Sequence, residues 1–428
     1  MKSISGSKKK AYFVLLATLL VCMLVTGSAQ AQTPAAPRIV KIGVLLPMSG
    51  GWSEIGKTMV EGIQFVVDEI VQAGGIKSLG GASIRLVFGD TTSDPKVAAA
   101  EMERLIVKER VAFVLGPYAT PECGAAVPVA EAHKIPVLSI ESSGDPLFPQ
   151  NYHYWRTLAM PTREYGRTFP TYIHELVTEY GIKADRIVIL WDDTAIFRTF
   201  AAAAKEYLAE IGWTNRLVAE VYFDPKALDL TSVAARVKAA NPDVVIGPGY
   251  FAGGMSMLRA LDAIGWYPPI QIGLDLSLGT PKAFNALGPE LGKKMLQRPG
   301  EFFTAYFAAK SPRKEVQSFL DRAKVYALSK GYPALEVNFV TGAQATYVLW
   351  RLLETTASTD PVTLNEALHK FELREGDPFF IGHAWLPVLK WQPNGKPVNA
   401  ALALVQWNGM DQEIIYPKAI RTAAPRLR

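Results

Sequence analysis

The chain has 428 residues, of which 49% are hydrophobic and 20% charged, and its formal net charge is +5. This length exceeds one ordinary hydrophobic core, so we expect at least two domains, and the hydrophobic fraction excludes a globally disordered chain. The first 31 residues hold four lysines and no acid, so without them the net charge falls from +5 to +1. That value lacks the strong basic excess typical of nucleic-acid binding, and no nucleic-acid partner is expected.

The first 31 residues have the pattern of a secretory signal peptide. Lysines at 8–10 precede an apolar run at 11–25, and the small-x-small sequence Ala29-Gln30-Ala31 follows. We predict cleavage after residue 31 and a secreted mature protein. A membrane anchor is the alternative, but the run is short for a transmembrane helix. Cys123 is the only cysteine after residue 31, so no internal disulfide is expected, and we interpret it as an inert thiol.

The stretch at 39–75 organises the chain. It begins with an apolar, β-rich run at 39–47, which predicts a buried parallel strand. A glycine-rich loop follows, and then apolar residues recur at helical spacing until Gly74 and Gly75 end the pattern. In open α/β sheets, such a loop at the carboxyl end of a strand is where ligands bind.

Strand-like and helix-like segments alternate through the rest of the chain, which predicts parallel sheets covered by helices. A first set has strands at 83–88, 111–115 and 135–140, with helices at 95–108 and ending near 133. A second set has strands at 186–191, 217–223, 244–246 and 270–273, with helices at 195–211 and 231–240. Later segments include amphipathic helices at 317–330 and 340–354 and a hairpin at 400–416, whose turn is Asn408-Gly409-Met410-Asp411. The basic tail, with Arg421, Arg426 and Arg428, is expected to be solvated and frayed.

The two sets resemble each other. The segment at 111–117 is similar to that at 243–248. The segment at 135–141 is similar to that at 269–275, and each of these two is an apolar strand that ends in an acid. We therefore predict an α/β protein with two Rossmann-like lobes, whose strand ends face each other across a cleft. The predicted division is 38–157 with 299–386 for the first lobe, and 158–298 with 387–428 for the second. The chain is then expected to cross between the lobes more than twice.

No catalytic or metal-binding motif is present. The sequence lacks a Gly-x-Ser-x-Gly elbow and a phosphate-binding loop, and its five histidines do not have metal-ligand spacing. Asp192 and Asp193 could hold a divalent ion, although solvated carboxylates are the favoured interpretation. We predict a protein that is not an enzyme and has no cofactor and no metal.

Polar side chains follow several predicted strands. Thr120 and Ser143 lie beside expected helix N-termini, where free backbone N–H groups favour a carboxylate. Asp275 suits an ammonium group, and Tyr250 ends another strand loop. Across one cleft, these residues would hold a zwitterion by its two ends. The alternative is that Thr120 and Ser143 are only helix caps.

Over residues 38–416 the chain resembles the periplasmic solute-binding proteins of branched-chain amino acid ABC transporters, of the Leu/Ile/Val-binding type. The resemblance is carried by Ile42-Gly43-Val44-Leu45-Leu46-Pro47-Met48-Ser49-Gly50, Asp68-Glu69-Ile70, Ala73-Gly74-Gly75-Ile76, Asp90-Thr91-Thr92-Ser93-Asp94-Pro95, Gly116-Pro117-Tyr118, Ala239-Ala240-Asn241-Pro242-Asp243 and Gly249-Tyr250. It implies a type I periplasmic binding fold with a multi-crossover hinge. It also implies capture of a small organic solute, led by branched-chain or aliphatic amino acids, and delivery to separate ABC permease subunits by a soluble monomer. Amides, urea-like compounds and aromatic carboxylates are alternative ligands, and a sensor role is an alternative function.

The resemblance also implies roles for particular residues. Thr120 would bind the ligand carboxylate, Asp275 its ammonium group, and Tyr250 would contact it from the second lobe. The remaining expected ligand-binding residues are Trp52, Tyr118, Glu141, Ser142, Ser143, Phe197 and Phe339. Trp52 would roof the cleft or lie on the surface, Phe197 or Arg198 would replace a family tyrosine, and Phe339 would line the side-chain pocket. Glu141 is unusual for the family, and if it points inward it disfavours a ligand carboxylate and favours a cation or an amide.

Overall fold

The computed structural model describes residues 38–305, 310–331, 335–382, 388–398 and 401–428. The predicted signal peptide and His383 lie outside these residues.

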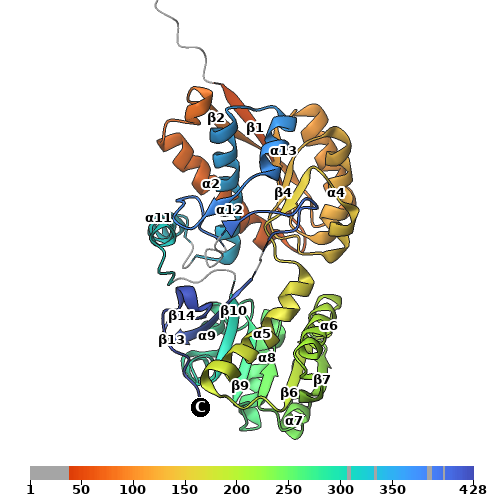
Figure 1. The fold of residues 1–428 in the computed structure, drawn as a ribbon, viewed down its shortest axis with the longest axis vertical. Coiled ribbons are helices and arrows are strands. Elements are labelled where there is room, and N and C mark those ends of the chain that lie inside the picture. The colour runs from red at the N-terminus through yellow and green to blue at the C-terminus, as the bar shows by residue number, and fades with distance from the viewer. Residues whose placement is uncertain (1–37, 306–309, 332–334, 383–387, 399–400) are drawn as a thin grey trace, which may run out of the picture. The chain divides into compact units, whose positions relative to one another are not determined.

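Two large β-sheets with flanking helices make up the fold (Figure 1). The strands are β1 (Ile39–Leu46), β2 (Ser83–Asp90), β3 (Phe113–Leu115), β4 (Val137–Ser139), β5 (Trp155–Thr157), β6 (Ile187–Asp192), β7 (Leu217–Phe223), β8 (Val244–Ile246), β9 (Ile270–Leu274), β10 (Glu301–Ala305), β11 (Leu373–Arg374), β12 (Val388–Leu389), β13 (Ala403–Asn408) and β14 (Asp411–Tyr416). The α-helices are α2 (Ser53–Gln72), α3 (Pro95–Glu103), α4 (Thr120–His133), α5 (Thr162–Tyr180), α6 (Ala195–Glu210), α7 (Thr231–Ala239), α8 (Phe251–Ala263), α9 (Lys282–Leu287), α10 (Pro289–Leu296), α11 (Lys314–Ser329), α12 (Val337–Thr356) and α13 (Pro361–His369).

The first sheet has the strand order β2-β1-β3-β4-β5, and all its strand pairs are parallel. β1 lies inside the sheet between β2 and β3, and its apolar run is buried, with Ile42 and Val44 fully inaccessible. The segment predicted as one helix at 95–108 is α3 followed by a π-helical turn (Arg104–Lys108). Asp94 caps α3 by accepting hydrogen bonds from the backbone N–H groups of Lys96 and Val97.

Helices α2 and α12 pack closely against each other, although more than 260 residues separate them in the sequence (Figure 1). Glycines allow this approach. A Cβ atom at Gly62 would overlap the carbonyl oxygen of Phe339, and one at Gly342 would overlap that of Met59. Helix α12 therefore completes the helical cover of the first sheet.

The second sheet has the order β14-β13-β10-β9-β8-β6-β7. Strands β6 to β10 are parallel, and the predicted hairpin, β13 and β14, adds an antiparallel edge. β10 was assigned with the first lobe in the predicted division, but it hydrogen-bonds to β9 and β13, so the strand belongs to the second sheet. The chain passes between the two sheets more than twice, as expected, because α12 packs on α2 before β13 rejoins the second sheet. With β10 reassigned, the lobe boundaries stay a prediction.

The basic C-terminal tail is not frayed, contrary to the prediction. The guanidinium of Arg421 donates two hydrogen bonds to the carboxylate of Glu179, at 2.6 and 2.8 Å. The backbone N–H of Arg426 donates to Gln406 Oε1 at 2.8 Å, and its carbonyl accepts from Gly300. The tail is fixed because it pairs with polar groups along the second sheet. No helix in the described ranges is long and apolar enough to cross a membrane.

Candidate functional site

The loops after β3 and β4 bring the predicted hydroxyl groups together. Thr120 is the first residue of α4, and its Oγ1 atom lies 3.5 Å from Oγ of Ser142. Ser143 belongs to the same loop, where its carbonyl accepts a hydrogen bond from the backbone N–H of Thr162 at 2.9 Å. The side chain of Glu122 accepts from the N–H of Ala119 at 3.0 Å, so Glu122 caps α4 instead of Thr120. The Thr120 hydroxyl is therefore not used as a helix cap.

Two aromatic residues of the predicted site, Trp52 and Tyr118, lie in the loops after β1 and β3. The rings of Trp52 and Tyr118 meet edge to face, with centroids 6.0 Å apart. The backbone N–H of Trp52 donates to Ser93 Oγ at 3.0 Å, which fixes the loop before α2. Burial raises the pKa of Tyr118, and the nearby Glu141, Tyr250 and Glu122 raise it further. Tyr118 is therefore a neutral hydroxyl donor at physiological pH.

Glu141 follows β4, and its Oε1 atom lies 3.1 Å from Oγ1 of Thr341 on α12. The residue keeps some exposed surface, but burial of its carboxyl group raises its pKa to about 7. The Thr341 contact lowers this pKa, and the negative charge of Asp275 raises it. Glu141 thus lies within electrostatic range of Asp275, as expected if both line one site. Thr341 could not be singled out from the sequence, because it is one of several threonines on a mostly apolar helix.

Asp275 directly follows β9, at the carboxyl end of a central strand of the second sheet. The residue is half-buried, and its Oδ1 atom accepts a hydrogen bond from the backbone N–H of Leu276 at 2.9 Å. Its neighbour in the sheet, β8, leads through Gly247, Pro248 and Gly249 into Tyr250. The Tyr250 side chain is 40% exposed, so its ring remains available for ligand contact. Both residues follow strands of the second sheet, and their roles in ligand binding stay a prediction.

Asp192 holds the loop that carries Tyr250, a role that the sequence interpretation missed. It ends β6 and is fully buried, and its Oδ2 atom accepts a hydrogen bond from the backbone N–H of Tyr250 at 3.0 Å. The sequence analysis interpreted Asp192 and Asp193 as solvated, and this is wrong for Asp192. Burial raises the pKa of the Asp192 carboxyl group. Asp193 is exposed and forms an ion pair with Arg198 at 2.7 Å. No group of three His, Cys, Asp or Glu side chains suited to a metal occurs in the described part of the chain.

The two phenylalanines of the predicted site are buried. Phe197 stacks on Trp191, with centroids 4.9 Å apart, and its ring meets that of Tyr250 at 4.8 Å. It therefore supports Tyr250 from behind. Phe339 is 3% exposed and packs against Phe65 and Tyr326. Packing in the helical layer explains why Phe339 is buried. Its predicted role in lining a ligand pocket stays a prediction, and this packing does not support it.

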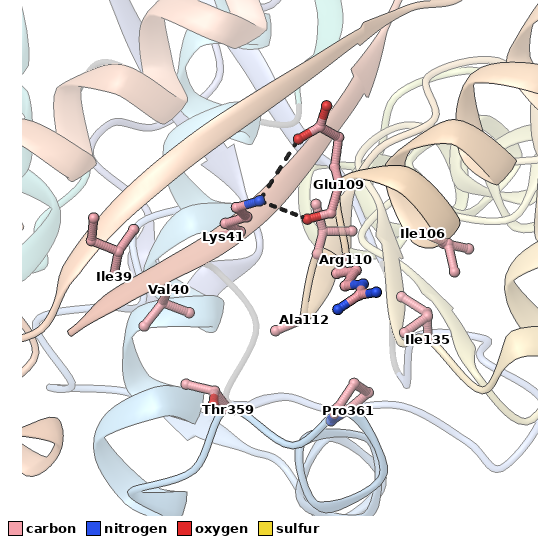
Figure 2. Close-up of a pocket in the computed structure, with 11 residues that line it drawn as sticks. Ile39, Val40, Lys41, Ile106, Glu109, Arg110, Ala112, Ile135, Thr359 and Pro361 are labelled. Carbon is pink, nitrogen blue, oxygen red and sulfur yellow. Dashed lines mark hydrogen bonds and ion pairs between the residues drawn. The ribbon is translucent and has the colours of Figure 1, made fainter.

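Figure 2 shows a pocket of about 440 Å³ in another part of the first sheet. Its lining includes Ile39 at the start of β1 and the residues just before β3 and β4, so it lies at the amino ends of the strands. Lys41 crosses its wall and donates to the carbonyl of Glu109 at 2.9 Å. None of the predicted ligand-binding residues lines this pocket.

Two α/β units with parallel-sheet cores have the architecture of the type I periplasmic binding proteins. The family model described as "Periplasmic binding protein" matches residues 39–412, and the chain belongs to this family. The family consists of binding proteins and not of enzymes, as the sequence analysis predicted. The predicted fold class is confirmed as well.

Similar proteins span almost the whole chain. The Leu/Ile/Val-binding protein homolog 7 of Brucella suis is 22% identical over 419 residues, which are 96% of this chain and 98% of the relative. The branched-chain amino acid transporter substrate binding protein LivJ of Streptococcus pneumoniae, solved with isoleucine, has a TM-score of 0.62 and 20% identity over 86% of this chain and 100% of its own. An R. palustris solute binding protein, solved with benzoate, has a TM-score of 0.66 and 19% identity over 91% and 98% of the two chains.

Proposed function

We propose that this protein captures an amino acid of the branched-chain or aliphatic type between its two lobes and delivers it to an ABC permease. One observation carries the proposal: Glu141, in the loop after β4 of the first sheet, interacts electrostatically with Asp275, which follows β9 of the second. Groups from the carboxyl ends of both sheets thus contribute to one region, which is how α/β folds bind small ligands.

In the proposed complex, different residues bind the two ends of the ligand. Thr120, Ser142 and Ser143, at the start of α4 and in the loop after β4, would receive the carboxylate. Asp275 would accept hydrogen bonds from the ammonium group, and Tyr250 would cover the ligand from the second sheet. Trp52 and Tyr118, which already meet edge to face, would bound the apolar side chain.

The transport role follows from ligand-dependent closure. A ligand that contacts both lobes stabilises the closed form over the open form, and the permease then recognises the closed protein. We further propose that the mature protein is a periplasmic monomer released after cleavage at residue 31. The permease and its ATPase would be separate chains.

An aromatic carboxylate is the second candidate ligand, since a protein of the same fold was solved with benzoate. Asp275 weighs against it, because its negative charge, which also raises the pKa of Glu141, would repel a ligand whose only charge is negative.

A thermal-shift screen of the mature protein against amino acids, amides, urea-like compounds and aromatic acids tests the proposal. A ligand at one hundred times its dissociation constant stabilises the folded state by about 2.7 kcal/mol. We expect the largest rise in melting temperature with aliphatic amino acids. A rise with aromatic acids alone would transfer the assignment to the second candidate, and no rise with any compound would contradict a small-solute function.

A further inference from the structure

The pocket of about 440 Å³ in Figure 2 contains none of the predicted ligand-binding residues. Its volume lies within the range of small-molecule pockets, about 300–1,000 Å³. Most of its lining is apolar and comes from the start of β1 and the segments before β3 and β4, including Val40, Val111, Ala112 and Ile135. Ile39 also lines it and is 57% exposed. The pocket therefore presents an apolar surface that the described part of the chain leaves open to solvent.

Arg110 is an unpaired cation in this pocket. The residue is exposed, and it forms no hydrogen bond or ion pair with any residue of the described ranges. Figure 2 shows its guanidinium group between Ala112 and Ile135. A guanidinium group keeps its charge at every physiological pH. The pocket therefore combines a permanent positive charge with an apolar wall.

The acids near the pocket already have partners. The carboxylate of Glu109 lies 3.8 Å from Nζ of Lys41 and 3.6 Å from a guanidinium nitrogen of Arg104. Asp360 does not line the pocket, and its carboxylate accepts hydrogen bonds from the N–H and the hydroxyl group of Thr363, both at 2.8 Å. The unpaired positive charge therefore favours a ligand that is an anion.

The backbone of Arg110 also indicates a role for its side chain. Its φ is +57°, in the left-handed region, where the helical turn ends and the N–H of Val111 donates to the carbonyl of Leu105 at 3.2 Å. Glycine is favoured at such a position because it has no Cβ atom. Arginine costs stability here, and no polar contact of its side chain within the described residues offsets that cost. Binding of a ligand by the guanidinium group would explain why an arginine occupies this position.

We propose that this pocket is a second binding site, which takes an organic anion with an aliphatic body, such as a medium-chain carboxylate. The planar guanidinium of Arg110 donates two parallel hydrogen bonds to the carboxylate. The aliphatic chain lies against the apolar walls and covers Ile39. An amino acid is disfavoured because Glu109, already paired, offers nothing to its ammonium group. The inference goes beyond the proposed function, since this pocket lies at the amino ends of the strands and the proposed amino-acid site at their carboxyl ends.

Calorimetric titration of the mature protein with three probes tests the ligand class. Octanoate has both the anion and the aliphatic chain, acetate has only the anion, and octylammonium has the chain with the opposite charge. We expect octanoate to bind at one site per chain, and acetate and octylammonium to bind at least about tenfold more weakly. Added salt should weaken the binding of octanoate, because the exposed charge of Arg110 is screened. Equal binding of octanoate and octylammonium would contradict the assigned charge.

Two variants test the assigned residues. Arg110→Gln should weaken octanoate binding roughly 5- to 20-fold and remove most of its salt dependence. Arg85→Gln is the matched control, because Arg85 is an exposed arginine on β2 that lies outside the pocket and also has no partner within the described residues. Ala112→Leu fills part of the pocket and should weaken octanoate binding without a change of charge. Melting temperatures of the ligand-free variants show whether each one is folded.

A crystal structure of the mature protein with octanoate locates the bound molecule. A carboxylate beside Arg110 supports the inference, and a carboxylate beside Thr120 overturns it. Failure of octanoate to bind, or unchanged affinity in Arg110→Gln, also overturns it. None of these results bears on the proposed function, which the screen with amino acids tests separately. Failure of every amino acid in that screen, with octanoate still bound beside Arg110, would contradict the proposed function and leave this inference standing.

Discussion

The backbone N–H of Tyr250 donates a hydrogen bond to Oδ2 of Asp192 at 3.0 Å. This bond joins the loop after β8 to the end of β6, and a Cβ atom at Gly249 would overlap both Asp192 and Phe197. The loop that presents the exposed ring of Tyr250 therefore lies on a buried carboxylate and a buried phenylalanine. Its position is determined by packing behind the site before any ligand arrives.

Asp192→Ala should destabilise the ligand-free protein by about 1–3 kcal/mol, because the N–H of Tyr250 loses its buried acceptor. Ligand affinity should also fall, since Tyr250 is no longer fixed. Chemical denaturation and calorimetric titration measure the two effects. Asp192→Asn retains an acceptor oxygen, so it should keep most of the stability and most of the ligand affinity of the wild-type protein. Equal losses in the two variants would show that the charge of Asp192 matters and not its hydrogen bond.

Asp275→Ala should weaken the binding of an amino acid by roughly tenfold to a few hundredfold. A hydrogen bond between charged groups contributes about 1.5–3 kcal/mol, and the ammonium group left without a partner adds to the loss. Thr120→Ala should weaken binding less, because backbone N–H groups at the start of α4 still hold the carboxylate. Titration calorimetry on the two variants compares these effects. Unchanged affinity in Asp275→Ala would mean that the ligand has no ammonium group at this position.

The stability of the ligand-free protein should depend on pH through Glu141. Its pKa is about 7 in the folded protein and 4.5 ordinarily, so the folded state retains a proton that the unfolded chain loses. The contribution of Glu141 to the free energy of unfolding is therefore highest below pH 4.5, falls as the pH rises towards 7, and is constant above that. The Glu141→Gln variant lacks this pH dependence. Between pH 5 and pH 8, its free energy of unfolding should rise by roughly 3 kcal/mol relative to that of the wild-type protein.

Denaturation curves of the two proteins at both pH values measure this difference. Burial also raises the pKa of Glu301 to about 7, but Glu301 is present in both proteins, so the comparison isolates Glu141. Parallel stability curves for the two proteins would contradict the assignment.

Gly62→Ala should destabilise the protein by about 1–3 kcal/mol, because its methyl group would overlap the backbone of Phe339 on α12. Thermal unfolding with and without ligand measures the loss. Gly51→Ala is the control, since a Cβ atom at Gly51 meets no atom within 4 Å and should leave the unfolding temperature almost unchanged. A neutral effect at Gly62 would mean that the two helices can separate without loss of stability.

Apolar runs predicted the central strands well, because strands buried on both faces need continuous hydrophobic sequence. β8 lies at the predicted residues, and β6 differs by one residue at each end. β10 was missed because it begins with Glu301, a charged residue that is buried only through its ion pair with Arg298. No local pattern discloses such a partner.

At the site, the position of each loop could be predicted, but the direction of individual side chains could not. Asp192 and Asp193 look equivalent in the sequence. Side chains alternate along a strand, so one of the two points inward, and only the surrounding structure shows that it is Asp192. Thr341 was missed for a related reason: its contact with Glu141 joins residues 200 positions apart.

The pairing of α2 with α12 also determines when the first sheet can be covered during synthesis. The strands β1 to β5 and helix α2 emerge early, yet the helix that covers α2 ends at Thr356. Before that residue has been made, α2 lacks the full length of its partner α12 and packs on the strands β1 and β2, although the second sheet up to β10 is already complete in sequence. Contacts between such distant segments form slowly. The first sheet therefore receives its complete helical cover only after most of the chain has been made.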